Sequence, residues 1–144
     1  MRTILAVVAA AVIAALGVTA YASTSARGLP AYTNGYATWR RVNARPFTRC
    51  GPPCAHSGVK NVYASKPKVG SRYPNGTVVV KTVGRTGDAA QRPSQIAVMR
   101  KLAGRWVYVE YVLSGSRYGV LAQGRFCQSC HMRARATDYV FTTK

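Results

Sequence analysis

Acidic side chains are almost absent from this 144-residue sequence, which has only Asp88, Glu110 and Asp138 against 21 Lys and Arg residues, for a net charge of +18. Catalysis by paired carboxylates needs two acids with separated pKa values, and three scattered acids make that mechanism a poor fit. The basic side chains are spread over residues 27–144 and form no single stripe, so we expect no nucleic-acid partner. The charge favours either a solvated basic surface or attraction to acidic proteins, anionic lipid or cell-wall polymers.

The N-terminus has the composition of an export signal. Residues 4–18 contain only Ile, Leu, Val, Ala and Gly, Arg2 precedes them, and the small-x-small pattern A-Y-A follows at residues 20–22. This layout predicts a secretory signal peptide over residues 1–22 and one periplasmic or secreted domain over residues 23–144. The alternative is an uncleaved membrane anchor, although residues 4–21 fall just short of the ~20 residues that span a bilayer.

The remaining chain lacks internal repeats and low-complexity segments, and its apolar residues follow strand patterns. Strands are predicted at residues 59–64, 77–83, 95–102 and 106–113. Helical turns are predicted at residues 36–42, and a helix at residues 120–135, which has few β-branched residues. In the last strand, Glu110 should share a face with Trp106 and Tyr108. We therefore expect an α+β fold, a mainly antiparallel β-sheet with a few helices.

The C-terminal helix carries the motif C-Q-S-C-H at residues 127–131, which is the attachment pattern of a c-type haem. Residues i and i+3 lie on one face of a helix, so the thiols of Cys127 and Cys130 can reach the two vinyl groups of one porphyrin. The next residue, His131, can then direct an imidazole nitrogen to the iron. The motif predicts one covalently bound haem c with His131 as the iron ligand.

Two other interpretations of the C-x-x-C pair fit less well. A zinc site needs a second ligand pair at suitable spacing, and Cys50 and Cys54 enclose a Pro-rich stretch that is a poor match. A thioredoxin-like pair belongs at the start of a helix that follows a strand of a parallel sheet. Here the pair lies near the C-terminus of a β-rich chain.

Cys50 and Cys54 remain after the two thioether positions are assigned. In an oxidising compartment we expect them to form a local disulfide. The small loop that it closes would contribute only about 2 kcal/mol by chain entropy. A reactive dithiol is the alternative. His56 is not adjacent to Cys54, so a second haem is not expected there.

Several segments, in order, resemble the cytochrome P460 and cytochrome c′-beta family. They are W-R-R-V-N-A-R-P-F at 39–47, Y-P-N-G-T-V-V-V-K at 73–81, G-R-W-V-Y at 104–108, the haem motif, and D-Y-V-F-T at 138–142. The resemblance implies a mainly antiparallel β fold and a homodimer. It also implies a five-coordinate haem with His131 proximal and an open distal side, which either binds small gases such as nitric oxide or oxidises hydroxylamine.

The resemblance also implies roles for two further residues. Lys81 matches the lysine that the enzymes of the family link to the haem ring, although an exposed strand lysine is an equal alternative. Those enzymes use a distal carboxylate just before the strand at residues 95–102, where this chain has S-Q-I-A at 94–97 and no acid. That departure argues against hydroxylamine oxidation, because the base is missing. Phe47 matches the aromatic residue that caps the distal face in the gas-binding branch, and ordinary core packing is its alternative.

Three functions follow, in this order of preference. The first is gas binding, chiefly of nitric oxide. The second is electron transfer with a sixth iron ligand, for which Met99 and His56 are the candidates. The third is oxidation of hydroxylamine or another small nitrogen compound, which would gain weight if Glu110 faced the haem. The basic surface suits docking on an acidic redox partner.

Overall fold

The computed structural model describes residues 26–49, 54–86, 88 and 92–142. The predicted signal peptide at residues 1–22 lies outside these ranges, and so does Cys50. The cleavage site and the Cys50–Cys54 disulfide therefore remain predictions. In the described part of the chain, no helix has the length and apolar character needed to cross a membrane.

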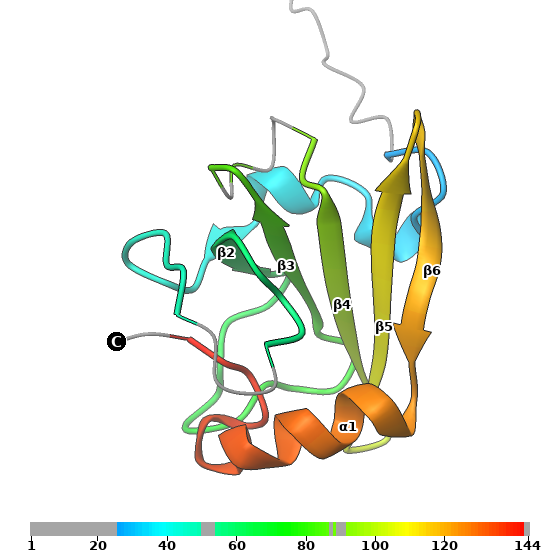
Figure 1. Cartoon of the computed structure of the whole chain (residues 1–144). Helices are drawn as coiled ribbons and strands as arrows, with labels where there is room; N and C mark the ends of the chain where they lie inside the picture. The colour runs from blue at the N-terminus through cyan, green and yellow to red at the C-terminus, as the bar shows by residue number, and fades with distance from the viewer. Residues whose placement is uncertain (1–25, 50–53, 87, 89–91, 143–144) are drawn as a thin grey trace, which may run out of the picture.

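The fold is built on one antiparallel sheet in which the six strands lie in sequence order (Figure 1). The strands are β1 (Arg40–Arg41), β2 (Val59–Ala64), β3 (Val78–Gly84), β4 (Gln95–Leu102), β5 (Arg105–Ser114) and β6 (Arg117–Gln123). The four predicted strands are confirmed within one residue at each end, and Ala103 and Gly104 form the turn between β4 and β5. The predicted α+β class is confirmed as well.

Alternation along the strands divides the core between the two faces of the sheet. One face packs with Leu29 and with the 3-10 helices η1 (Ala31–Thr33) and η2 (Tyr36–Thr38), which supplies Tyr36. The other face carries Val79, Met99, Trp106 and Tyr108 and packs with C-terminal residues of the chain. Glu110 lies on this second face, as the alternation of β5 predicted.

The predicted helix at residues 120–135 is wrong over its first part. Residues 117–123 form the edge strand β6, in which Val120 pairs with Tyr111 and Gly119 with Val112. Because this strand is largely exposed and Gly119 lies at its centre, its sequence lacks the β-branched, alternating pattern of the inner strands. The helical turns predicted at residues 36–42 are likewise confined to η2, and Arg40 and Arg41 form strand β1 instead.

The haem motif lies on the helix α1 (Arg125–His131), which continues into the 3-10 helix η4 (Met132–Thr137). Gly124, at φ 68°, ends β6 and turns the chain into α1. Residues 125–136 include no β-branched side chain, which favours a helix here. α1 runs across one end of the sheet, close to β5 and β6 (Figure 1).

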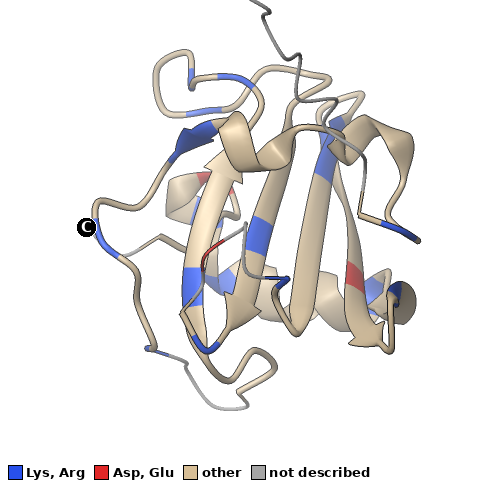
Figure 2. Ribbon diagram, turned by 90° about the horizontal axis from the view of Figure 1, so that it is seen from above, with Lys and Arg blue, Asp and Glu red and all other residues tan. Residues whose placement is uncertain are grey.

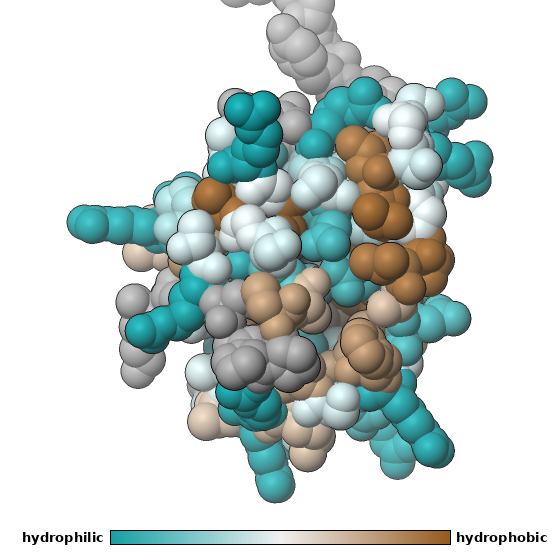
Figure 3. All heavy atoms as spheres, in the orientation of Figure 1, coloured by the Kyte–Doolittle hydropathy of each residue, from teal (hydrophilic) through white to brown (hydrophobic). Residues whose placement is uncertain are grey.

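Charge and hydropathy are distributed unevenly over the surface. Lys and Arg residues lie on strands, loops and the C-terminal helices, with few acids between them (Figure 2). Val120 and Leu121 of β6 are exposed, and hydrophobic surface gathers on the β6 side of the molecule (Figure 3). The molecule is therefore basic over most of its surface and apolar along one sheet edge.

Candidate functional site

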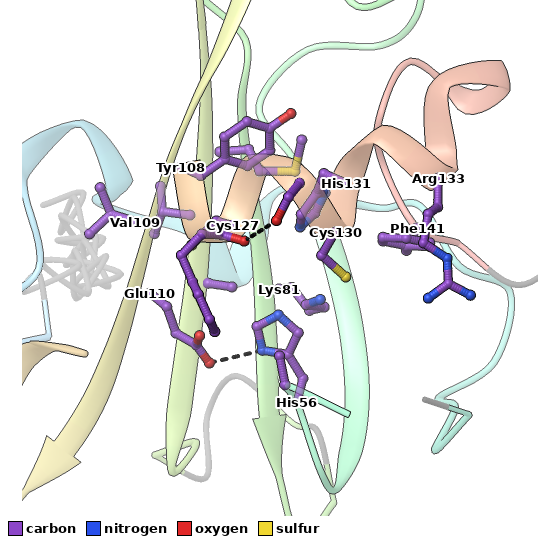
Figure 4. A pocket seen from close by; sticks show the side chains of 16 residues that line it. His56, Lys81, Tyr108, Val109, Glu110, Cys127, Cys130, His131, Arg133 and Phe141 are labelled. Carbon is purple, nitrogen blue, oxygen red and sulfur yellow. Dashed lines mark hydrogen bonds and ion pairs between the residues drawn. The ribbon is translucent and has the colours of Figure 1, made fainter. Parts of the chain in front are cut away.

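A cavity of about 260 Å³ lies between α1 and the second face of the sheet (Figure 4). Most of its lining comes from three sources: the helix α1, the strands β3 to β5, and the segments around residues 56 and 141. The lining residues are Ala55, His56, Lys81, Ala97, Val98, Met99, Tyr108, Val109, Glu110, Phe126, Cys127, Ser129, Cys130, His131, Arg133 and Phe141. The haem motif therefore faces the same space as the polar residues of the sheet.

The floor of the cavity follows from strand register. Lys81 of β3 pairs with Ala97 of β4, and Ala97 pairs with Glu110 of β5, so the three residues form one row across the sheet. The methyl group of Ala97 leaves space between the two longer side chains. A β-bulge at Glu110 and Tyr111 interrupts the pairing of β5 with β6 at this point, and bulges commonly redirect side chains beside functional sites.

His131 is buried and its ring is held in one orientation. Its Nδ1 lies 2.7 Å from the backbone carbonyl oxygen of Tyr139. A carbonyl can only accept, so Nδ1 must donate, and Nε2 is then the unprotonated nitrogen that can ligate a metal. The rings of Tyr108 and Phe141 pack against the imidazole, with centroids at 4.8 and 5.2 Å. Burial lowers the pKa of His131 to about 4, so the neutral form prevails at neutral pH.

Cys127 and Cys130 are half-buried thiols on the cavity side of α1. Neither is in a disulfide. Burial raises the pKa of the Cys127 thiol, so it is protonated at neutral pH. The two cysteines and His131 therefore present the complete C-x-x-C-H donor set to one cavity.

His56 and Glu110 form a close polar pair on the opposite side of the cavity, with Nδ1 of His56 2.9 Å from Oε1 of Glu110 (Figure 4). The Glu110 side chain is only 5% exposed. Burial lowers the pKa of His56, and the interaction with Glu110 opposes this shift. The sequence suggests His56 as a candidate iron ligand and Glu110 as a possible base, but it does not predict this contact between them.

Lys81 is buried, which excludes the exposed strand lysine that the sequence left open. Its side chain lines the cavity beside Glu110 and His56. Burial lowers the pKa of Lys81 to about 8, although the Glu110 carboxylate partly opposes the shift. A lysine with this pKa is partly neutral near physiological pH.

Phe47, the predicted distal cap, is not among the side chains that line the cavity. It bridges to Lys60 and lies half-buried at the edge of the second core cluster, with the Lys60 ammonium 5.8 Å from its ring centroid. Its role as core, the alternative in the sequence analysis, fits this position. Met99 lines the cavity but is buried between Val79 and Tyr108 in the strand row next to Ala97.

Several lining residues were not predicted as site residues, among them Tyr108, Phe126, Arg133 and Phe141. Tyr108 could have been found, because it alternates with Glu110 on the predicted strand. Arg133 and Phe126 flank the motif on α1 and η4, and only the docking of these helices on the sheet brings them to the cavity. Phe141 belongs to D-Y-V-F-T, and its contact with His131 explains part of that resemblance.

The donor set fits a haem. The His131 ring is fixed with Nε2 as the ligating nitrogen, two thiols lie at the i and i+3 positions of one helix, and the surroundings are largely apolar side chains. These features define an antiparallel β-sheet protein with a haem-binding cavity. The sequence model of the cytochrome P460 family matches residues 33–142, so the chain belongs to that family, which implies a haem cofactor. No curated protein and no solved structure matches the chain.

Proposed function

We propose that this chain is an exported cytochrome that carries one haem c, bound covalently through Cys127 and Cys130 and ligated by His131. The observation that carries the proposal is the 2.7 Å hydrogen bond from His131 Nδ1 to the Tyr139 carbonyl oxygen, which makes Nε2 the unprotonated nitrogen and supports its role as the iron ligand. When bound, the haem supplies an iron that takes up small ligands and changes oxidation state. The protein supplies the axial ligand, the covalent anchor and the surrounding cavity.

His131 would hold the iron of a bound haem, and the cavity would leave space for a small gas such as nitric oxide. The small Ala97 side chain at the centre of the cavity floor supports this assignment, because it leaves room in front of the sheet. Electron transfer with Met99 as a sixth ligand is less well supported, since that side chain is 5% exposed and packs in the core between neighbouring strands. His56 as a sixth ligand would have to keep or exchange its contact with Glu110.

Oxidation of hydroxylamine or another small nitrogen compound is the second candidate. The observation that favours it is the presence of Glu110 in the cavity, beside Lys81 and 2.9 Å from Nδ1 of His56. A carboxylate–imidazole pair can accept a proton from a ligand, which supplies the base that the stretch at residues 94–97 lacks. Unchanged turnover in Glu110→Gln would remove this possibility.

The visible spectrum of the purified holoprotein, oxidised and dithionite-reduced, tests the proposal with and without nitric oxide. We expect a broad reduced Soret band that shifts when the gas is added. A band displaced far to the red would instead indicate a Lys81 crosslink and favour the enzyme. Sharp, split α and β bands that nitric oxide leaves unmoved would indicate six ligands and an electron carrier.

The chain's cellular setting follows from its sequence and resemblance. Export to the periplasm or secretion rests on residues 1–22, and a homodimer rests on the resemblance to the family. The exposed Val120 and Leu121 on β6, the last strand of the sheet, are compatible with a partner on that side of the molecule. An acidic redox partner rests on the +18 net charge.

A further inference from the structure

The carbonyl that holds His131 belongs to a strained segment. Asp138 and Tyr139 follow η4 and adopt φ values of 56° and 65°. Two consecutive non-glycine residues in the left-handed region are rare, because the Cβ atom crowds the backbone there. Such a conformation persists only where surrounding contacts enforce it.

The enforcing contacts converge on the Asp138 carboxylate. Oδ2 accepts hydrogen bonds from the Lys101 ammonium at 2.7 Å and from the Tyr73 backbone N–H at 2.8 Å, and Oδ1 accepts one from the Trp106 indole at 3.4 Å. Both Lys101 and Asp138 are buried. Burial alone would raise the pKa of this carboxyl, but the three hydrogen bonds outweigh it and the pKa is lowered, so the group stays ionised. Donors from β4, from β5 and from the loop before β3 thus fix one residue of the C-terminal segment.

The fixed residue directs its neighbour. The Tyr139 N–H donates to the Ala134 carbonyl at 2.8 Å, and the Tyr139 carbonyl oxygen then lies 2.7 Å from His131 Nδ1. The Thr137 hydroxyl donates to the Val140 carbonyl at 2.8 Å, which closes the segment on itself. The ion pair of Lys101 and Asp138 is therefore linked to His131 through the adjacent residue, Tyr139.

We propose that Asp138 is a positioning residue for the haem iron, which holds the Tyr139 carbonyl against His131 and so sets the orientation and basicity of that ligand. The inference rests on the proposed ligation of the iron by His131. A carbonyl that accepts firmly from Nδ1 increases electron donation from Nε2, which strengthens the iron–histidine bond and stabilises the oxidised iron. If the Tyr139 carbonyl is held less firmly, its hydrogen bond with His131 Nδ1 should weaken. The iron–histidine bond should then weaken as well, which favours the reduced iron.

The test compares four holoprotein variants with the wild type by resonance Raman spectroscopy of the ferrous iron–histidine stretch and by reduction potential. Asp138→Gly removes the carboxylate while glycine keeps φ near 56° without strain. Lys101→Met removes only the ammonium, and Asp138→Asn keeps an oxygen that can accept from Tyr73. Lys66→Met is the matched control, because Lys66 is an exposed lysine that bonds the Asn75 carbonyl.

We expect the stretch to move to lower wavenumber and the potential to become more positive in Asp138→Gly and Lys101→Met. A smaller shift is expected in Asp138→Asn, and none in Lys66→Met. A purely structural role predicts a lower melting temperature with an unmoved stretch and potential, and that outcome would overturn the proposal. If the variants carry haem but their stretch and potential equal those of the wild type, only the positioning role of Asp138 is contradicted. If the wild type itself carries no covalent haem, the proposed function is contradicted as well.

Discussion

Lys101 and Asp138 lie 2.7 Å apart and their side chains are only 7% and 6% exposed, so neither charge can be removed alone without cost. The same carboxylate maintains two left-handed residues, each of which costs roughly 1–2 kcal/mol in an L-amino acid. At the residue scale, the site depends on a few buried polar groups. Asp138, Glu110 and His131 are three of them, although acids are scarce in the chain.

Asp138 should make stability depend on pH in the acid range. Its pKa is lowered in the folded protein, so the unfolded chain binds the proton more readily. The stabilisation is complete above the ordinary carboxyl pKa of about 4 and is lost as pH falls through the lower folded value. Urea unfolding should show Asp138→Asn less stable by about 3 kcal/mol at pH 7, with the difference shrinking below pH ~4.

Asp88→Asn is the control for that measurement, because Asp88 is an exposed carboxylate. We expect it to change the free energy of unfolding by less than about 0.5 kcal/mol. An Asp138→Asn difference that stayed constant from pH 7 to pH 2 would show that the carboxyl charge does not contribute to stability.

At the scale of elements, the inner strands position the cavity and could be predicted from sequence. Residues 59–64 and 95–102 match β2 and β4 to the residue, because buried strands impose alternation or β-branched runs. β6 was missed because an exposed edge strand needs neither pattern. The helix start at Arg125 depends on Gly124, which the predicted helix had run through.

The contacts within the site could be predicted only in part. The C-x-x-C-H spacing is local, so Cys127, Cys130 and His131 were found from sequence. The pairing of His56 with Glu110 joins a loop to β5, and the anchoring of Asp138 joins the C-terminal segment to β4. Such contacts depend on how distant elements dock, which periodicity does not encode. The position of Phe47 beside the second core cluster, outside the cavity lining, depends on such docking as well.

The strand row through Lys81, Ala97 and Glu110 predicts the effect of filling the cavity. Ala97→Leu places a larger side chain in the floor, and overpacking of this kind costs about 1–3 kcal/mol. We expect nitric oxide to bind about tenfold more weakly, the equivalent of about 1.4 kcal/mol, as measured by titration of the Soret shift. The far-UV circular dichroism should be unchanged, since the backbone of β4 is paired on both sides.

Ala122→Leu provides the matched control. Ala122 lies in the same row on β6, opposite Glu110, but does not line the cavity. Its affinity for nitric oxide should equal that of the wild type. Equal affinities for wild type and Ala97→Leu would mean that the gas does not occupy the space in front of Ala97.

At the scale of the whole molecule, the +18 net charge should control encounters with charged redox reagents. We expect the second-order rate of oxidation of the reduced protein by ferricyanide, an anion, to fall steeply as ionic strength rises from 0.01 M to 0.5 M. The Debye length shrinks from about 30 Å to less than 10 Å over that range, which screens the attraction. A tris(phenanthroline)cobalt(III) cation should show the opposite trend.

Those two reagents act as controls for each other, since both report on the same haem. A ferricyanide rate that is independent of salt would indicate that the basic side chains do not act together near the haem. It would also count against docking of an acidic partner at this site.

Covalent attachment of haem to Cys127 and Cys130 is the central property proposed for this protein. The decisive measurement is the mass of the purified, denatured holoprotein, compared with that of the Cys127→Ala/Cys130→Ala double variant. We expect the wild type to retain the mass of one haem after denaturation and the double variant to lose it. A wild-type mass equal to that of the polypeptide alone would contradict covalent attachment, and with it the assignment of this chain as a c-type cytochrome.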